Sequence, residues 1–372
     1  MTNKIIALLL CNAIAQNVAA QNDRTRMAHI GLVYPISTNG KDAKQYTNNG
    51  SFHAIAGVSA AENAFCISGV ANMITHNADG FILAGVHNQI GKNASGLQLS
   101  GFSNFIKGNA QGLQLAGFVN IVKDTGKGVQ LAGFSNISRY SNNQIAGFCN
   151  VAKETEGTQI SGFTNVSKKI NGLQITGFAN VAKDVEGVQI AGFINVAQKV
   201  KGVQVAGFIN IADSCEYPLG LVNIIKNGEQ YIGATFDETG TALLSFRSGS
   251  KRMYGILGAG FNVSDKSLRY GLEGGVGMHI PLSPWFRFKT EFTVLSLTDF
   301  TDGVLLKSSL RILPSVRLGR CFEVFAGPSF GFSNHPDYLG DQLHLHYVWS
   351  RKSNGTFYGL NIGGMAGLQL RL

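Results

Sequence analysis

The chain has 372 residues, a formal net charge of +9 and only 14% charged residues. It contains 47 glycines, and phenylalanine outnumbers tryptophan by 24 to 2, a bias that suits tight β-structure better than helices. No stretch beyond the N-terminus offers about 18 consecutive apolar residues, so the sequence predicts no transmembrane helix, and its length predicts two architectural units.

The N-terminus has the order of a secretory signal peptide. Lys4 precedes an apolar run over residues 5–10, and the small residues Val18-Ala19-Ala20 come just before Gln21. We predict a signal peptide over residues 1–20, a mature chain that begins at Gln21, and an N-terminal strand and cap over residues 21–56. Cys11 follows Leu10 and not a small residue, which argues against a lipoprotein cleavage site.

A short repeat dominates the middle of the chain. A Gly-x-x-Asn core recurs eleven times between Gly69 and Asn223, and eight consecutive copies widen it to a seven-residue motif of the form Gln189-Ile-Ala-Gly-Phe-Ile-Asn195. The repeat glycines lie at positions 69, 85, 101, 117, 133, 147, 162, 177, 192, 207 and 220. Arrays of this kind usually build an extended surface and not a catalytic cleft.

The period distinguishes two architectures. Each copy alternates, with Val188 and Ile190 on one parity and Gln189 and Ala191 on the other, which indicates a strand. Duplication within an antiparallel membrane barrel normally leaves a two-strand period of about 30 residues. Coils of a parallel β-solenoid all have the same orientation, so a one-coil period is natural. We therefore predict a parallel β-solenoid of about eleven 15-residue coils over residues 57–227.

Stacked coils would place the repeated side chains in ladders about 4.8 Å apart. One ladder would contain Asn104, Asn120, Asn136, Asn150, Asn165, Asn180, Asn195 and Asn210, and a second the phenylalanines two residues before each. The parity that faces inward stays open, because a bend at Gly192 would let Ile190 and Phe193 both point inside. A ladder that satisfies the turns is preferred over a comb that binds ligand.

The C-terminal third loses this period and shows longer alternating strands. Charges and glycines fill one face and hydrocarbon the other, as where Arg287, Lys289 and Glu291 oppose Phe286, Phe288 and Phe292. This pattern predicts a small antiparallel, membrane-type β-barrel over residues 228–372. The fold class is therefore all-β. The candidate strands are 229–236, 240–248, 252–263, 267–280, 284–297, 303–318, 320–333, 342–350 and 355–372.

Nine strands is an odd number, and bacterial barrels usually close with an even one. Either one segment is not a barrel strand, which gives eight, or the early strand over residues 30–35 joins the last one, which gives ten. Aromatic residues near strand ends are candidates for interfacial girdles. They are Tyr254, Tyr270, Trp285, Tyr347, Trp349 and Tyr358.

The repeats, the segment Ile30-Gly-Leu-Val-Tyr-Pro-Ile-Ser-Thr-Asn-Gly40 and the segment Tyr217-Pro-Leu-Gly-Leu-Val-Asn-Ile-Ile225 together resemble a family of bacterial surface-repeat proteins from Gram-negative organisms. The resemblance covers most of the predicted mature chain. It implies placement at the cell surface or in the outer membrane, and it brings no catalytic residues. One departure is Leu372, because outer-membrane barrels commonly end in an aromatic residue.

Candidate chemistry is sparse, and we predict no catalytic, cofactor-binding or metal-binding residues. His344 and His346 would share one face of a strand, but two ligands without a third are weak support for a metal. His279 with Ser283 nearby suggests a lipid hydrolase, yet no nucleophile motif accompanies them. We expect Glu273 with Arg269, and Glu291 with Lys289, to cancel charge inside a narrow lumen. Four cysteines, Cys66, Cys149, Cys215 and Cys321, show neither a disulfide framework nor metal spacing and are interpreted as small buried thiols.

The functional prediction is a non-enzymatic outer-membrane or cell-surface protein whose solenoid serves adhesion or glycan contact. The alternatives are one large outer-membrane barrel channel formed by the whole chain, and an outer-membrane lipid-modifying enzyme. Expected partners are outer-membrane lipid or lipopolysaccharide and an extracellular glycan or protein, with the oligomeric state open. Nucleic acid is disfavoured because the lysines are spread one or two per repeat and do not cluster beside aromatic residues.

Overall fold

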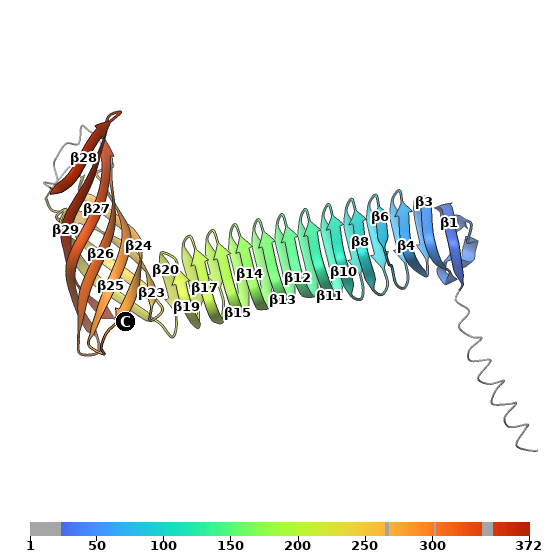
Figure 1. Cartoon of the computed structure of the whole chain (residues 1–372), viewed down its shortest axis with the longest axis horizontal. Helices are drawn as coiled ribbons and strands as arrows, with labels where there is room; N and C mark the ends of the chain where they lie inside the picture. The colour runs from blue at the N-terminus through green and yellow to red at the C-terminus, as the bar shows by residue number, and fades with distance from the viewer. Residues whose placement is uncertain (1–23, 265–267, 301–302, 337–344) are drawn as a thin grey trace, which may run out of the picture. The chain divides into compact units, whose positions relative to one another are not determined.

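The computed structural model describes residues 24–264, 268–300, 303–336 and 345–372 (Figure 1). The predicted signal peptide, Cys11 and His344 lie outside the described residues. The fold is nearly all β, with a parallel β-solenoid of about 12 turns and a closed antiparallel barrel of 8 strands, which confirms the predicted fold class. The chain divides into two compact units, Met1–Lys153 and Glu154–Leu372.

The first unit consists of stacked coils. Its strands are β1 (Thr25–Val33), β2 (Ile36–Ser37), β3 (Thr47–Ser59), β4 (Ala61–Ser68), β5 (Ala71–Ile74), β6 (Phe81–Ala84), β7 (His87–Ile90), β8 (Ala94–Ser100), β9 (Ser103–Ile106), β10 (Ala110–Ala116), β11 (Val119–Ala132) and β12 (Ser135–Ala146), with the 3-10 helix η1 (Gly40–Gln45) between β2 and β3. Equivalent repeat positions pair in parallel and in register, as in Leu99↔Leu115↔Leu131. Parallel pairing already begins with β1 and β3, ahead of the sequence repeat.

The second unit holds further coils and the barrel. After β13 (Cys149–Ser161) the coil strands are β14 (Thr164–Thr176), β15 (Ala179–Ala191), β16 (Ile194–Val196), β17 (Lys199–Ala206), β18 (Ile209–Ala212), β19 (Ser214–Leu219) and β20 (Val222–Ile225). The pairing Gln174↔Gln189↔Gln204 is parallel and in register. The alternative of one antiparallel barrel for the whole chain is therefore wrong.

The barrel follows the last coil. Its strands are β21 (Glu229–Asp237), β22 (Thr241–Gly249), β23 (Met253–Asn262), β24 (Tyr270–Pro281), β25 (Phe286–Thr298), β26 (Val304–Leu318), β27 (Phe322–Pro336) and β29 (Thr356–Arg371). Antiparallel pairing of β21 with β29 closes the ring. β28 (Tyr347–Ser353) pairs with β29 alone, so the predicted strand 342–350 is the one that does not belong to the ring of eight. The strand over residues 30–35 does not join the barrel, because it belongs to the solenoid.

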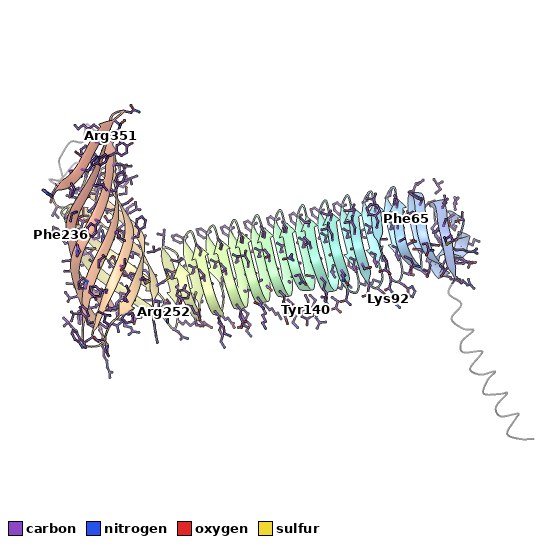
Figure 2. All side chains as sticks on the ribbon, in the orientation of Figure 1. Phe65, Lys92, Tyr140, Phe236, Arg252 and Arg351 are labelled. Carbon is purple, nitrogen blue, oxygen red and sulfur yellow. The ribbon has the colours of Figure 1, made fainter. Side chains whose placement is uncertain are left out.

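The barrel is apolar outside and charged inside. Large hydrophobic side chains on all its strands are exposed, among them Leu244, Phe292 and Leu368. Phe236, labelled in Figure 2, is another. Alternate residues on the same strands point into the lumen, where seven charged side chains are at most 1% exposed. They are Arg247, Glu273, Lys289, Glu291, Lys307, Arg311 and Glu323. This is the opposite of a soluble sandwich, which buries its hydrocarbon.

The last coil is joined to the barrel through the hairpin of β22 and β23. Asn223 donates its backbone N–H to Ser248 Oγ at 2.9 Å and its side-chain amide to Ser248 O at 3.2 Å. Arg252 donates to the Tyr217 hydroxyl at 2.8 Å. These contacts place the last coil at the end of the barrel where β21 begins.

Candidate functional site

The inward parity of the repeat is the polar one. Gln189 and Asn195 have no exposed surface, and Ala191 is 4% exposed, whereas Ile190 and Phe193 are 37% and 42% exposed. The same division holds in the other coils. Within the repeated motif, amides and small side chains therefore face the coil interior, and Ile190 and Phe193 lie on the outer surface. Elsewhere in the coils, aliphatic residues such as Ile106 and Val122 form a buried core beside these amides. Buried amides are stable only when each finds a partner, and stacking provides those partners.

The asparagines form a continuous ladder within each unit. Asn104 donates to Leu115 O at 2.8 Å and to Asn120 Oδ1 at 2.9 Å, and Asn180 makes the same two bonds to Ile190 O and Asn195 Oδ1 in the second unit. This confirms the predicted ladder and its structural role. At its ends, Asn72 accepts from Ser68 and Cys66, and Asn223 donates to the barrel residue Ser248.

A second ladder, formed by the glutamines, runs in the opposite direction. Gln189 donates to Gln174 Oε1 at 2.7 Å, and Gln204 donates to Gln189 Oε1 at 2.9 Å, so these glutamines bond to the preceding coil. The asparagines of the same coils instead bond to the following coil. The Gln ladder is interrupted at Gln130, whose Nε2 makes no hydrogen bond to any described residue. Because the amides are buried in the coil interior, they are not presented to a ligand, which argues against the ligand-comb interpretation.

The phenylalanines stack along one outer corner, which we call the Phe edge. It comprises Phe102, Phe118, Phe134 and Phe148 in the first unit and Phe163, Phe178, Phe193 and Phe208 in the second. Neighbouring ring centroids in the first unit are 4.7–4.8 Å apart with nearly parallel planes. Because each ring covers the next, the Phe edge presents ring edges and not ring faces to solvent. The Phe edge therefore does not offer the exposed ring faces on which sugar rings stack.

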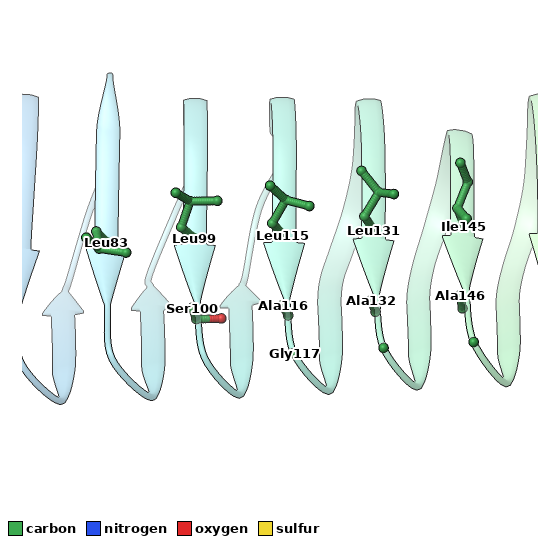
Figure 3. Close-up of a pocket in the computed structure, with 12 residues that line it drawn as sticks. Leu83, Leu99, Ser100, Leu115, Ala116, Gly117, Leu131, Ala132, Ile145 and Ala146 are labelled. Carbon is green, nitrogen blue, oxygen red and sulfur yellow. The ribbon is translucent and has the colours of Figure 1, made fainter.

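A shallow apolar groove runs beside the Phe edge in the first unit (Figure 3). It has a volume of about 670 Å³, and one wall is a column of Leu83, Leu99, Leu115, Leu131 and Ile145. Its floor includes Gly117, Gly133 and Gly147. A Cβ on Gly117 would lie 2.0 Å from the carbonyl oxygen of Gly101 in the preceding coil. Close backbone approach thus requires glycine, and the groove is the space that the absent side chains leave.

The first coils bury a second polar cluster. Glu62 has no exposed surface and accepts hydrogen bonds from Asn48 Nδ2 at 3.1 Å and Ser51 Oγ at 2.8 Å. Burial raises the pKa of Glu62 to about 7, although these hydrogen bonds act in the opposite direction. Burial, with a contribution from His29, lowers the pKa of His53 to about 4. His53 Nε2 lies 3.2 Å from His29 Nδ1, and burial lowers the pKa of His29 as well.

The barrel lumen is filled by ion pairs. Arg247 Nε lies 3.0 Å from Glu291 Oε1, and Tyr254 donates its hydroxyl proton to the same oxygen at 2.9 Å. Arg311 pairs with Glu273 at 2.6 Å. The predicted pair of Glu273 with Arg269 is therefore wrong. Glu291 and Lys289 both lie in the lumen and attract each other as predicted, although the ion pair that Lys289 makes at 3.8 Å is with Glu323. Arg269 is exposed, and Lys289 lies against Glu323 and over the ring of Phe325.

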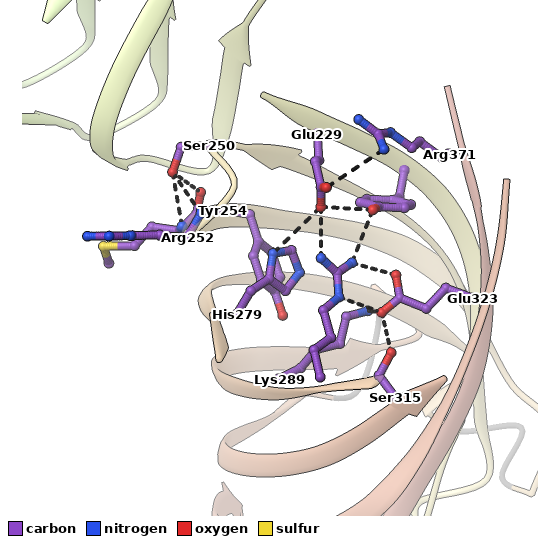
Figure 4. A network of polar contacts seen from close by, with 12 residues as sticks. Glu229, Ser250, Arg252, Tyr254, His279, Lys289, Ser315, Glu323 and Arg371 are labelled. Atoms are coloured by element: carbon purple, nitrogen blue, oxygen red, sulfur yellow. Dashed lines mark hydrogen bonds and ion pairs between the residues drawn. The ribbon is translucent and has the colours of Figure 1, made fainter. Parts of the chain in front are cut away.

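A network at the end of the lumen near the coils centres on Glu229 and Glu323 (Figure 4). Arg287 bridges the two carboxylates, with 2.8 Å from NH1 to Glu229 Oε2 and 2.8 Å from Nε to Glu323 Oε1. Tyr231 and Arg317 donate to Glu229, while Ser315 and Gln369 donate to Glu323. Every carboxylate oxygen here faces a cation or a hydroxyl, which is the arrangement expected of a plug and not of a substrate cleft.

The predicted hydrolase pair is not brought together. His279 stacks on Tyr254 inside the lumen, with its Nδ1 3.9 Å from Glu229 Oε2. Ser283 accepts the backbone N–H of Phe286 in the turn after β24. Among the described residues no hydrogen bond joins the two, because lumen and turn place them in different surroundings. Tyr254 is 2% exposed, so its predicted place in an outer girdle is also wrong.

The structure tests the predicted histidine pair only in part, and it describes all four cysteines of the predicted mature chain. In the described part of the chain no group of three or more His, Cys, Asp or Glu residues is arranged to hold a metal ion. His346 is described and its predicted partner His344 is not. All four described cysteines are free thiols; Cys66 and Cys215 are buried as predicted, whereas Cys321 is exposed in a barrel turn. None of the described helices has the length and apolar character to cross a membrane.

Comparison of the chain with protein-family models, curated proteins and solved structures gives no match. The functional argument therefore rests on the geometry of the coils and the barrel.

Proposed function

We propose that the chain is a non-enzymatic outer-membrane protein whose barrel is the membrane anchor and whose solenoid is the binding scaffold that it carries. The observation that supports this most strongly is the inverted barrel, with an apolar outer surface over charged side chains in the lumen. Its strands have 9 to 16 residues, and a tilted strand of about 9–11 residues spans a bilayer. The outer surface would contact lipid or lipopolysaccharide.

The lumen supports an anchor and not a channel. Arg247, Glu291 and Lys289 fill its middle, and each is at most 1% exposed. The network of Arg287, Glu229 and Glu323 fills the end near the coils. Water-filled pores need many more strands than eight, because the lumen of a small barrel is occupied by its own side chains.

The lengths of the connections between strands indicate the side on which the coils lie. At the barrel end that bears the last coil, the connections are residues 250–252, 282–285 and 319–321. At the other end β21 ends at Asp237 and β22 begins at Thr241, which is also a short connection, but the other strand pairs are further apart in sequence. β23 ends at Asn262 and β24 begins at Tyr270, β25 ends at Thr298 and β26 begins at Val304, and β27 ends at Pro336 and β29 begins at Thr356. Outer-membrane barrels have short periplasmic turns and longer extracellular loops. This orientation favours a periplasmic solenoid over the surface display expected from the sequence.

The scaffold would bind a glycan or protein on its outer surface. Stacked amides fix part of the coil interior, and the outward residues and the charged corners differ from coil to coil. A rigid array with variable outward positions suits an extended partner.

Thiol labelling of cells tests both placement and orientation. Native Cys321 is exposed at the short-turn end, and Arg351, in β28, is exposed at the opposite end. In a Cys149→Ser background, we expect a membrane-impermeant maleimide to label Arg351→Cys in intact cells. Cys321 should react only after the outer membrane is permeabilised.

The labelling results distinguish a periplasmic solenoid from an outward-facing one, and cell fractionation tests the membrane anchor. If Cys321 is labelled in intact cells and Arg351→Cys only after permeabilisation, the coils face outward and adhesion becomes the function. If the protein is recovered in the soluble fraction after cell lysis, the membrane anchor is refuted.

A further inference from the structure

Stacking gathers cations at one corner of the coils in the first unit. Val122 pairs in register with Ile106 and with Ser138, and the residue that follows each of these three in the sequence is a cation. We call the column of these three exposed cations, Lys107, Lys123 and Arg139, the cationic edge. Adjacent coils here are 4.7–4.8 Å apart, measured between Phe ring centroids, so like charges follow one another at about that interval. Figure 2 shows Lys92 and Tyr140 projecting from this side of the coils.

The chain does not neutralise this column. Residues 91–153 contain six cations and one acid, Asp124, a net charge of +5 out of +9 for the whole sequence. None of the three cations makes an ion pair with an acid in the described part of the chain. Residues 154–227 contain six lysines and six acids, a net charge of zero. Two ion pairs form there, Lys201 with Glu186 at 3.0 Å and Lys226 with Asp213 at 2.6 Å.

Aromatic rings contact two of the three cations of the cationic edge. Lys123 lies over the ring of Phe105 at 5.5 Å, and Arg139 and Lys153 lie over Tyr140 at 5.4 and 5.9 Å. The expectation that the cations do not cluster beside aromatic residues is therefore wrong, because stacking converts a spacing of 16 residues into one of about 5 Å. These ring faces are taken up by the protein's own cations. They are not free for the bases of a nucleic acid, which bind by stacking on such faces.

We propose that the cationic edge binds a linear anionic glycan that lies along the coil axis. Like charges stacked without acids repel one another, and a polymer with regularly spaced carboxylates removes that repulsion. The three cations lie along a line and do not spread over a plane. An extended polymer can therefore contact all of them at once, whereas a flat lipid surface can do so only in one orientation of the coils. Sugar hydroxyls and carboxylates need no aromatic faces. This assignment does not depend on whether the barrel lies in a membrane.

The test uses the full chain in nanodiscs of neutral lipid. Binding of a polyguluronate oligomer, with neutral dextran as the uncharged probe, is measured by calorimetry over a range of salt concentrations. The test variant is Lys107→Gln, Lys123→Gln and Arg139→Gln together. The matched control, Lys168→Gln, Lys183→Gln and Lys199→Gln, removes the same number of charges from the coils in which acids balance the lysines.

The native protein and the control should bind polyguluronate, and the test variant should bind about 10- to 100-fold more weakly with a shallower salt dependence. Equal loss in both variants would mean that only net charge matters, which overturns the assignment. Tighter binding to single-stranded DNA or to phosphatidylglycerol vesicles than to polyguluronate would also overturn it. Circular dichroism of both variants checks that the coils stay folded.

Discussion

The buried carboxyl of Glu62 makes the stability of the first coils depend on pH. Burial raises its pKa from 4.5 to about 7. Above pH 4.5 the unfolded chain releases the proton while the folded coils retain it, so the folded state loses stability as pH rises towards 7. Above that pH the loss is constant. The difference corresponds to about 3 kcal/mol.

Glu62→Gln removes this penalty. The amide oxygen still accepts from Asn48, and the amide group can donate to Ser51 Oγ, so the neutral hydrogen bonds are kept. We expect the variant to be more stable than the native chain by about 3 kcal/mol at pH 8 and nearly equal to it at pH 4. Opening of these coils is local, since each coil contacts only its neighbours.

Hydrogen exchange of the backbone amides of β3 and β4 measures this opening at each pH. Asp79→Asn, at an exposed acid of neighbouring coils, is the control and should change protection little at either pH. The reasoning is refuted if Glu62→Gln brings no added protection at pH 8. It is also refuted if the gain is the same at pH 4 and pH 8.

Three further substitutions test the ladders, the glycine column and the lumen. Asn180→Leu leaves the buried Ile190 carbonyl without its donor, so we expect a loss of about 2–4 kcal/mol in urea unfolding; an unchanged midpoint would contradict the structural role of the ladder. Gly192→Ala sets a Cβ 2.1 Å from the Gly177 carbonyl oxygen, and we expect a loss above about 3 kcal/mol or no folded protein by circular dichroism; native-like stability would mean that the coils are not so closely stacked. Glu291→Gln leaves the Arg247 charge buried without its partner, which should cost about 3–5 kcal/mol in thermal unfolding of the barrel in detergent, and a loss below about 1 kcal/mol would show that water reaches the lumen.

The solenoid was predictable because of its period. A repeat of about 15 residues gives each strand the same surroundings as the next, which only parallel stacking provides. The Asn ladder follows directly, since Asn180 and Asn195 occupy equivalent positions in adjacent coils. The number of barrel strands was not settled, because the sequence of the predicted strand 342–350 alternates like its neighbours and only pairing shows that β28 joins β29 alone.

The inward parity could not be obtained from alternation. The usual rule that hydrocarbon is buried favours Ile190 over Gln189, and the structure reverses it. A signal was present: Gln and Asn recur unchanged in consecutive copies while Leu, Ile and Val exchange on the other parity. A buried amide cannot be exchanged for another side chain, because it must match the amides of the neighbouring coils. An outward aliphatic residue can be exchanged for another aliphatic residue.

Lumen partners were missed for a different reason. Arg247 and Glu291 are 44 residues apart in sequence and meet only because the barrel closes. Proximity in sequence suggested Lys289, which lies on the same strand as Glu291 and points into the lumen beside it. The cationic edge was not predicted, although the period implies it. The sequence was interpreted by the spacing of lysines along the chain, and residues 16 apart become neighbours only when the coils stack.

The two ends of the asparagine ladder restrict how the array can change in evolution. Ser68 and Cys66 fill the acceptor of Asn72, and the barrel residue Ser248 takes the last donor from Asn223. A coil of the repeat inserted at either end of the ladder would replace the contacts that Ser68, Cys66 and Ser248 make with it. Recombination between near-identical internal copies, by contrast, adds or removes a whole coil and leaves both terminal contacts intact. Length can therefore vary between relatives of this chain while the sequences at the two ends of the array stay fixed.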